Sequence, residues 1–228
     1  MKNILHILIA IAMLPAILFS LEKADFIKYL ESDNPATRKM GAVSLKGNKD
    51  TDAVEKQKLA LSNETNPEVK KVLVMNLLEL KENSSIASYL DELGAEKKSI
   101  RAEIYKAISP LPEKIFLKAL VEGLNDPELE IQMEVLKALS IKKDKIIAPY
   151  IAYYFESLYL KDKKSTEKKA NDRQYDREVS KLKLLSIEII KNLGNKKLAE
   201  NLKGLSEKEF DENVKKKLLE MLEAVKTK

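Results

Sequence analysis

The chain has 228 residues and a formal net charge of +5, with 34% charged residues, no cysteine, no tryptophan and a single histidine. Without cysteine the chain has no disulfides, no thiol redox chemistry and no thiolate metal sites. The single histidine, His6, lies in an apolar N-terminal segment, and no glycine-rich phosphate loop or nucleophile elbow occurs. We therefore expect a non-catalytic protein with no cofactor and no metal. A catalytic site made only of carboxylates would still be compatible with this composition, but no pair of acids in the sequence indicates one.

Residues 1–20 have the layout of a secretory signal peptide. A short start with Lys2 precedes an apolar run from Ile4 to Phe19, and we expect cleavage after Ser20. The run is shorter than the roughly 20 residues of a membrane span. Leu18 is larger than the residue usually found three positions before cleavage, so a retained membrane anchor is the alternative. Both interpretations place the rest of the chain outside the cytoplasmic membrane.

Three short polar residues stand directly before a proline, each followed by a helical pattern. They form the dipeptides Asn34-Pro35, Asn66-Pro67 and Asp126-Pro127. An Asn or Asp side chain accepts hydrogen bonds from the free N–H groups of a first helical turn. Proline fits the first helical position, where its missing N–H costs nothing. Each dipeptide therefore predicts the start of a helix.

Other segments also have apolar residues at helical spacing, and sustained alternation of the strand type is hard to find. Asp50 or Thr51 is expected to cap one of these segments, and Ser206 with Glu209 forms a predicted capping box for the last. The further predicted helices cover residues 51–61, 84–94, 115–120, 144–160, 178–193 and 206–225. The sequence therefore predicts an all-α fold.

The predicted helix starts recur at a regular distance. The first and second dipeptides lie 32 residues apart, and the second and third lie 60 apart, which leaves room for one further unit. The segment 98–108 fits there without a proline. Periods of thirty-odd residues with two helices each are typical of solenoid repeats.

The start of the second helix in each period resembles the HEAT-repeat family, an armadillo-like helical family with short bacterial members. Val69-Lys70 and Val214-Lys215 match the family's Val-Arg or Val-Lys, and Thr37-Arg38 and Ile100-Arg101 are similar to it, whereas Leu129-Glu130 departs from it. Tetratricopeptide repeats share the period, but their signature of a tryptophan followed by Leu-Gly is absent, because the chain has no tryptophan. The resemblance implies a right-handed α-solenoid of about six HEAT-like helical hairpins over residues 21–228.

The resemblance also implies a structural role for one set of bases. In the family such residues line up and bond carbonyls or acids of adjacent repeats. The alternative is a positive stripe that binds an acidic partner. The set comprises Arg38, Lys70, Arg101 and Lys215.

A charged segment, residues 161–177, interrupts the fifth unit between its two helices. Its bases include Lys163 and Lys164, and almost no apolar residue lies between 161 and 176. It is either a solvated insertion or an arm that meets a partner, a membrane surface or another acidic polymer.

Tyrosines gather directly before this insertion. Packing between hairpins would explain them, but tyrosine is also enriched at protein interfaces. A helix that is apolar on two faces would favour the second interpretation. The candidate partner-binding residues are Tyr150, Tyr153, Tyr154, Tyr159, Lys163 and Lys164.

Together these features predict a protein-binding scaffold or adaptor exported to the periplasm, where it would bind a component of a cell-envelope assembly. The alternative is an adaptor held in the inner membrane by its N-terminal segment and facing the periplasm. Nucleic-acid binding is disfavoured because acids and bases are interspersed along the chain, whereas such binding requires a concentrated basic surface.

Overall fold

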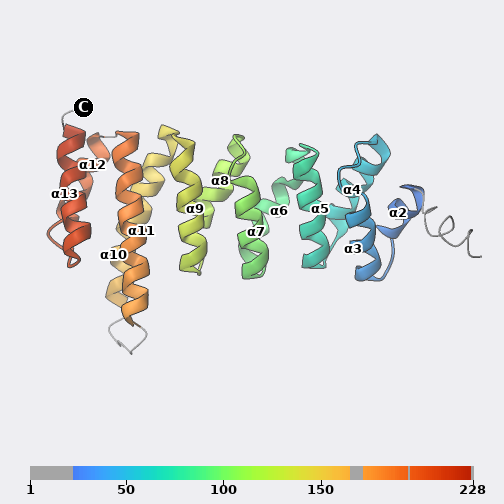
Figure 1. The fold of residues 1–228 in the computed structure, drawn as a ribbon, viewed down its shortest axis with the longest axis horizontal. Helices are drawn as coiled ribbons and strands as arrows, with labels where there is room; N and C mark the ends of the chain where they lie inside the picture. The colour runs from blue at the N-terminus through green and yellow to red at the C-terminus, as the bar shows by residue number, and fades with distance from the viewer. Residues whose placement is uncertain (1–22, 165–171, 195, 227–228) are drawn as a thin grey trace, which may run out of the picture. The chain divides into compact units, whose positions relative to one another are not determined.

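The structure is a computed structural model that describes residues 23–164, 172–194 and 196–226. In these ranges every regular element is helical and no strand occurs, which confirms the all-α prediction (Figure 1). The α-helices are α2 (Lys23–Tyr29), α3 (Pro35–Ser44), α4 (Thr51–Asn63), α5 (Pro67–Glu79), α6 (Ala87–Glu92), α7 (Lys98–Ile108), α8 (Lys114–Gly123), α9 (Leu129–Lys142), α10 (Ala148–Lys164), α11 (Asp172–Leu193), α12 (Lys196–Leu202) and α13 (Glu212–Lys226). Short 3-10 turns are η1 (Asn83–Ile86), η2 (Leu93–Ala95), η3 (Lys145–Ile147) and η4 (Lys203–Leu205).

The chain divides into two compact units, Met1–Leu90 and Asp91–Lys228. In the first unit α3 packs against both α2 and α5, and α4 packs against α5. Leu45, Leu73 and Leu77 are fully buried in its core. The unit is therefore built by layering neighbouring helices.

The second unit repeats this layering over more helices. In sequence order α7 packs on α9, α9 on α11 and α11 on α13, and these four helices lie side by side in Figure 1. The helices between them in sequence, α8, α10 and α12, each pack against the helix that follows. Phe116 and Phe155 are the largest fully buried side chains.

Two of the three predicted proline starts are confirmed. Asn34 Oδ1 accepts a hydrogen bond from Ala36 N at 2.8 Å, and Pro35 is the first residue of α3. Asn66 Oδ1 accepts from the backbone N–H groups of residues 68 and 69, and Pro67 begins α5. Asp50 caps α4 in the same way.

The third prediction is wrong, because α9 begins at Leu129 with Glu128 as its N-cap. Asp126 accepts a hydrogen bond from Glu128 N at 2.9 Å, so it shapes the turn before the helix. The capping box at Ser206 and Glu209 is wrong for a similar reason, because α13 starts only at Glu212 and Glu209 is buried. In both places the acid that was predicted to cap a helix is buried and makes a different contact.

The charged insertion is narrower than predicted. Helix α10 continues through Lys164 and α11 begins at Asp172, so both helices extend into the segment 161–177. Residues 165–171 and the predicted signal peptide, residues 1–20, lie outside the described residues. Of the helices in the described ranges, none is long and apolar enough to span a bilayer.

The contact between α2 and α3 depends on a glycine. A Cβ added at Gly41 would lie 2.8 Å from the carbonyl oxygen of Phe26 and 2.9 Å from the Cβ of Tyr29. We expect Gly41→Ala to lower the free energy of unfolding by about 1–3 kcal/mol, as overpacking does, despite alanine's better helix propensity. Urea unfolding followed by circular dichroism measures the change. Gly94→Ala is the control, because nothing lies within 4 Å of its added Cβ; equal stability of the two variants would contradict the prediction.

Candidate protein-binding surface

Helix α10 carries the tyrosine-rich segment and has a large buried face. Asp144 caps the preceding turn by accepting from Ile146 N at 3.0 Å, and α10 then packs against α11 and α12. The buried residues lie at helical spacing and are at most 5% exposed. They are Ile147, Ala148, Ile151, Ala152, Tyr154, Phe155 and Leu158.

The opposite face of α10 is apolar and exposed. Ile146 is 59% exposed, Tyr150 51% and Tyr153 72%, and Pro149 is also exposed. The spacing of Pro149, Tyr150 and Tyr153 places these three residues on one face of α10, and Ile146 precedes them in the turn η3. We call these four residues the α10 stripe. Helix α10 is therefore apolar on two faces, of which only one is covered by the part of the chain that the structure describes.

Tyr154 is not part of this stripe, because it is only 2% exposed. Its hydroxyl donates to Gln132 Oε1 of α9 at 2.5 Å, and Gln132 Nε2 donates to the carbonyl of Asp126 at 2.6 Å. Burial raises the pKa of Tyr154 above its ordinary value. This tyrosine joins α10 to α9 and is not accessible to a partner.

Tyr159 is also held within the chain. Its hydroxyl donates to Glu209 Oε2 at 2.6 Å, and its ring packs edge-on against Phe155 with the centroids 5.4 Å apart. The ammonium of Lys183 lies 4.1 Å from the centre of the Tyr159 ring and 3.2 Å from Glu209. Lys183 and Glu209 are both buried, so this cluster fixes α10 and α11 to the turn before α13.

Of the six predicted partner-binding residues, the structure thus leaves Tyr150 and Tyr153 exposed on one helix face. Lys163 and Lys164 belong to the last turn of α10, but their side chains lie outside the described residues. Ile146 and Pro149 complete the exposed surface. Sequence reasoning missed them because it selected the tyrosines and the lysines of the insertion, although the spacing of Ile146 and Pro149 from the tyrosines was already visible.

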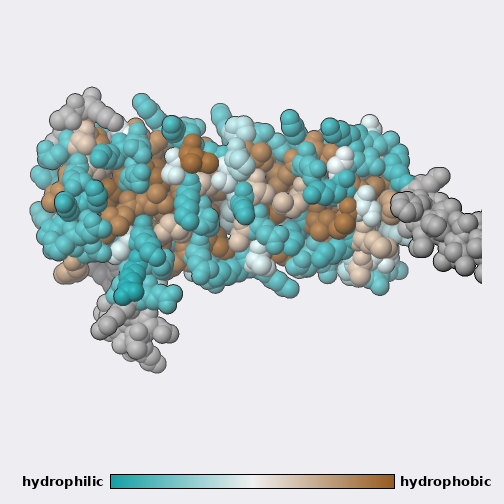
Figure 2. All heavy atoms as spheres, in the orientation of Figure 1, coloured by the Kyte–Doolittle hydropathy of each residue, from teal (hydrophilic) through white to brown (hydrophobic). Residues whose placement is uncertain are grey.

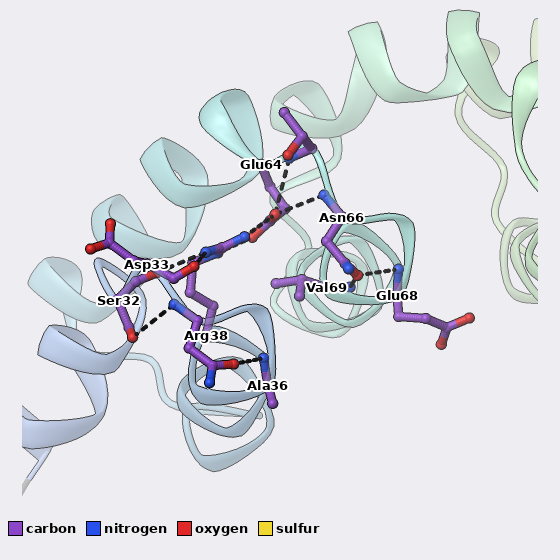
Figure 3. Close-up of polar contacts among 10 residues, drawn as sticks. Ser32, Asp33, Ala36, Arg38, Glu64, Asn66, Glu68 and Val69 are labelled. Atoms are coloured by element: carbon purple, nitrogen blue, oxygen red, sulfur yellow. Dashed lines mark hydrogen bonds and ion pairs between the residues drawn. The ribbon is translucent and has the colours of Figure 1, made fainter.

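The predicted ladder bases have a defined geometry at Arg38. Its Nε and Nη2 donate to the two carboxylate oxygens of Glu64 at 2.7 and 2.8 Å, and Nη1 donates to the carbonyls of Ser32 and Asp33 (Figure 3). Glu64 Oε1 also accepts from the backbone N–H groups of Thr65 and Asn66. Burial alone would raise the pKa of Glu64, but the hydrogen bonds from Arg38 and these N–H groups hold it below its usual 4.5.

Arg101 repeats this arrangement in the second unit. Its Nε and Nη2 donate to Asp126 at 2.7 and 2.9 Å, its Nη1 donates to the carbonyl of Glu96, and the Arg101–Asp126 pair is buried. Asp126 also accepts from Glu128 N. In each case the acid binds a base on one helix and the backbone turn that leads into a later helix, α5 or α9.

Lys183 and Glu209 form a third junction of this kind, which sequence reasoning missed. Glu209 accepts from Asp211 N at 2.9 Å, just before α13. From base to acid the junctions span 26 residues for Arg38, 25 for Arg101 and 26 for Lys183. This nearly constant distance in sequence between base and acid was the signal available for predicting the third junction. Lys70 and Lys215 lie half-buried in the first turns of α5 and α13.

A shallow groove of about 830 Å³ lies over α9, α11 and α13. Met133, Leu184, Leu185 and Ile187 are among its apolar lining residues, and lysines and glutamates also line it. Two of these charged pairs are local, Glu178–Lys181 and Lys217–Glu220. Figure 2 shows apolar surface between hydrophilic residues along these helices. No residue of the α10 stripe lines the groove.

Within the described ranges no group of three or more His, Asp or Glu side chains is placed to hold a metal ion. No family model and no curated protein matches the chain. The crystal structure of an engineered protein from the Northeast Structural Genomics Consortium is similar at 17% sequence identity, with a TM-score of 0.46, over 90% of this chain and 96% of that chain. A likeness this low carries no argument about fold or function.

The junctions predict unequal effects for two ion pairs of similar length. Arg101→Met leaves the carboxylate of Asp126 buried and without its charged partner, which costs about 3–5 kcal/mol of unfolding free energy. Lys118→Met breaks the pair with Asp91, also 2.7 Å long but with both side chains more than half exposed, and therefore lowers the unfolding free energy much less. Urea unfolding of the two variants measures both changes in the free energy of unfolding. A decrease for Arg101→Met no larger than that for Lys118→Met would disprove a structural role for the junction.

Proposed function

We propose that this protein is a non-catalytic scaffold that binds another protein through the α10 stripe. The observation that carries the proposal is that α10 is apolar on two faces, while residues 23–164, 172–194 and 196–226 cover only one of them. Tyr150 and Tyr153 on the other face, and Ile146 in the turn before it, are each more than half exposed. Contiguous apolar surface of this kind on a folded protein marks an interaction site.

The composition of the stripe suits a protein partner. Tyrosine presents a large apolar ring with a polar tip, and aromatic residues are enriched at protein interfaces, where they often dominate the binding energy. The helix beneath the stripe is held by Tyr154 and Tyr159 through their hydrogen bonds to Gln132 and Glu209. Because the backbone under the stripe is fixed, binding would require little ordering, which favours affinity.

We propose that both units are built from HEAT-like helical hairpins, about six in all, forming an α-solenoid. Two findings support this proposal: the alternation of helices in each unit, and the recurrence of a base–acid junction at Arg38, Arg101 and Lys183. A solenoid would present the groove over α9, α11 and α13 as a second surface for a partner.

The experiment that tests the binding role is in-cell crosslinking of tagged full-length protein, followed by pull-down and mass spectrometry. We expect Tyr150→Ala/Tyr153→Ala to lose at least tenfold of the dominant captured protein, because loss of about 1.4 kcal/mol already weakens binding tenfold. The fold should be unchanged by circular dichroism, since both side chains are exposed.

Leu59→Ala is the matched control, because Leu59 is an exposed apolar side chain of the first unit, far from α10 in sequence. It should capture the partner as the unchanged chain does. An unaltered partner list in the double variant would refute the assignment of the α10 stripe as the contact.

We further propose that the protein is exported and that its partner belongs to the cell envelope, on the layout of residues 1–20. N-terminal sequencing of the protein isolated from its host should give a mature chain beginning at about residue 21, because the signal peptide is removed on export. A chain that keeps residues 1–20 and fractionates with the inner membrane would favour the anchored adaptor. A chain that keeps them and fractionates with the cytoplasm would contradict both.

A further inference from the structure

We infer that one face of α13 binds a helical segment of a different protein, and that a carboxylate of this segment pairs with Lys215. The face comprises the residues that line one hollow along the helix, and we call it the α13 face. They are Glu212, Lys215, Lys216, Leu219, Glu220 and Glu223. None of them belongs to the α10 stripe, so the inference goes beyond the proposed function and does not depend on it.

Lys215 occupies a position that other helices use to bind a later part of the chain. It is the fourth residue of α13, as Arg38 is of α3 and Arg101 of α7. In all three helices its backbone N–H donates to the carbonyl of the residue that precedes the helix. Arg38 binds Glu64 and Arg101 binds Asp126, and each acid lies in the turn before a later helix, α5 or α9.

The same position has this role without a charge in α9. Gln132 is the fourth residue of that helix, and its Oε1 accepts a hydrogen bond from the hydroxyl of Tyr154 in α10. The fourth residue therefore binds a later element in α3, α7 and α9. At Lys215 the corresponding group is an ammonium, which has three donors and no acceptor, so a carboxylate is the strongest partner for it.

Lys215 has no such partner among the described residues. Its side chain is half-buried, but it makes no hydrogen bond or ion pair with residues 23–164, 172–194 or 196–226. Helix α13 packs on α11 and α12, and within its unit it is the last helix in the row of α7, α9, α11 and α13 (Figure 1). The α13 face is thus left open by the described helices of this unit.

An apolar side chain lies next to Lys215 on this face. Leu219 follows by four residues, about one helical turn, and is 47% exposed. The hollow that both residues line is shallow and has a volume of about 620 Å³. Leu219 also lines a smaller hollow of about 90 Å³, whose other apolar residues are Ala199, Leu222 and Val225. A cation beside apolar surface fits a partner helix that carries an acid and an apolar residue about one turn apart.

The acids of this chain disfavour a second copy as the occupant. Within the described ranges, Glu64, Asp126 and Glu209 are acids in turns before a helix, and each is already bound to its own base. An anionic membrane surface is disfavoured as well, because three glutamates line the same hollow and would repel it. A different protein that supplies a carboxylate at one point is the occupant that fits.

A photoreactive amino acid at position 219 of the full-length protein tests the inference in the cell. We expect a discrete product with one other protein, crosslinked in a segment that contains aspartate or glutamate. Lys215→Glu should lower the yield at least tenfold, because it brings two acids together. Lys215→Arg should retain at least half of the yield, since arginine holds this position in α3 and α7.

Lys208→Glu is the matched control. It makes the same change in charge at an exposed residue that lines neither hollow, and it should leave the yield unchanged. Circular dichroism should show the same fold for all three variants.

Reversal of charge on the partner completes the test. Changing the acid in the crosslinked segment to lysine should restore at least half of the yield with Lys215→Glu. Equal yields for Lys215→Glu and Lys208→Glu, or no restoration, overturns the inference, as does a product within one chain or between two copies of it, or no discrete product. A loss of captured protein in Tyr150→Ala/Tyr153→Ala would then still support the α10 stripe as a separate contact.

Discussion

Buried carboxylates shared between a basic side chain and a backbone turn fix the helices of both units. Glu64, Asp126 and Glu209 each accept from a base on one helix and from the N–H groups that precede a later one. A buried charge is tolerated only when it is paired and hydrogen-bonded, so these acids permit one relative placement of the two segments. The junctions therefore specify the relative placement of the helices that they join more than they add to the stability of the fold.

Helix α10 shows how these buried contacts determine which side chains are exposed. Tyr159 takes part in the junction of Lys183 and Glu209, and Tyr154 is bound through Gln132 to the backbone at Asp126. The hydrogen bonds of both tyrosines orient one face of α10 toward the core. Because of the helical spacing, Tyr150 and Tyr153 then point to solvent. The exposed stripe is thus held in place by the same contacts that order the helices, which fixes its orientation at the surface.

Much of the fold could be predicted from the sequence because its signals are local. Caps at Asn34 and Asn66 and the 3.6-residue spacing of apolar residues depend only on neighbours in the chain. The helix start at Asp126 could not be predicted, since its carboxylate is occupied by Arg101, 25 residues away. Likewise, the sequence singled out the tyrosines of α10 but could not separate Tyr153 from Tyr154, because burial depends on contacts with α9 and α11.

The central claim is that the outward face of α10 contacts another protein in the cell. A photoreactive amino acid placed at position 153 tests it most directly, with the same label at the exposed Lys118 of α8 for comparison. The account predicts discrete crosslinked products from position 153 and only diffuse background from position 118. Equal, diffuse labelling from the two positions would contradict it.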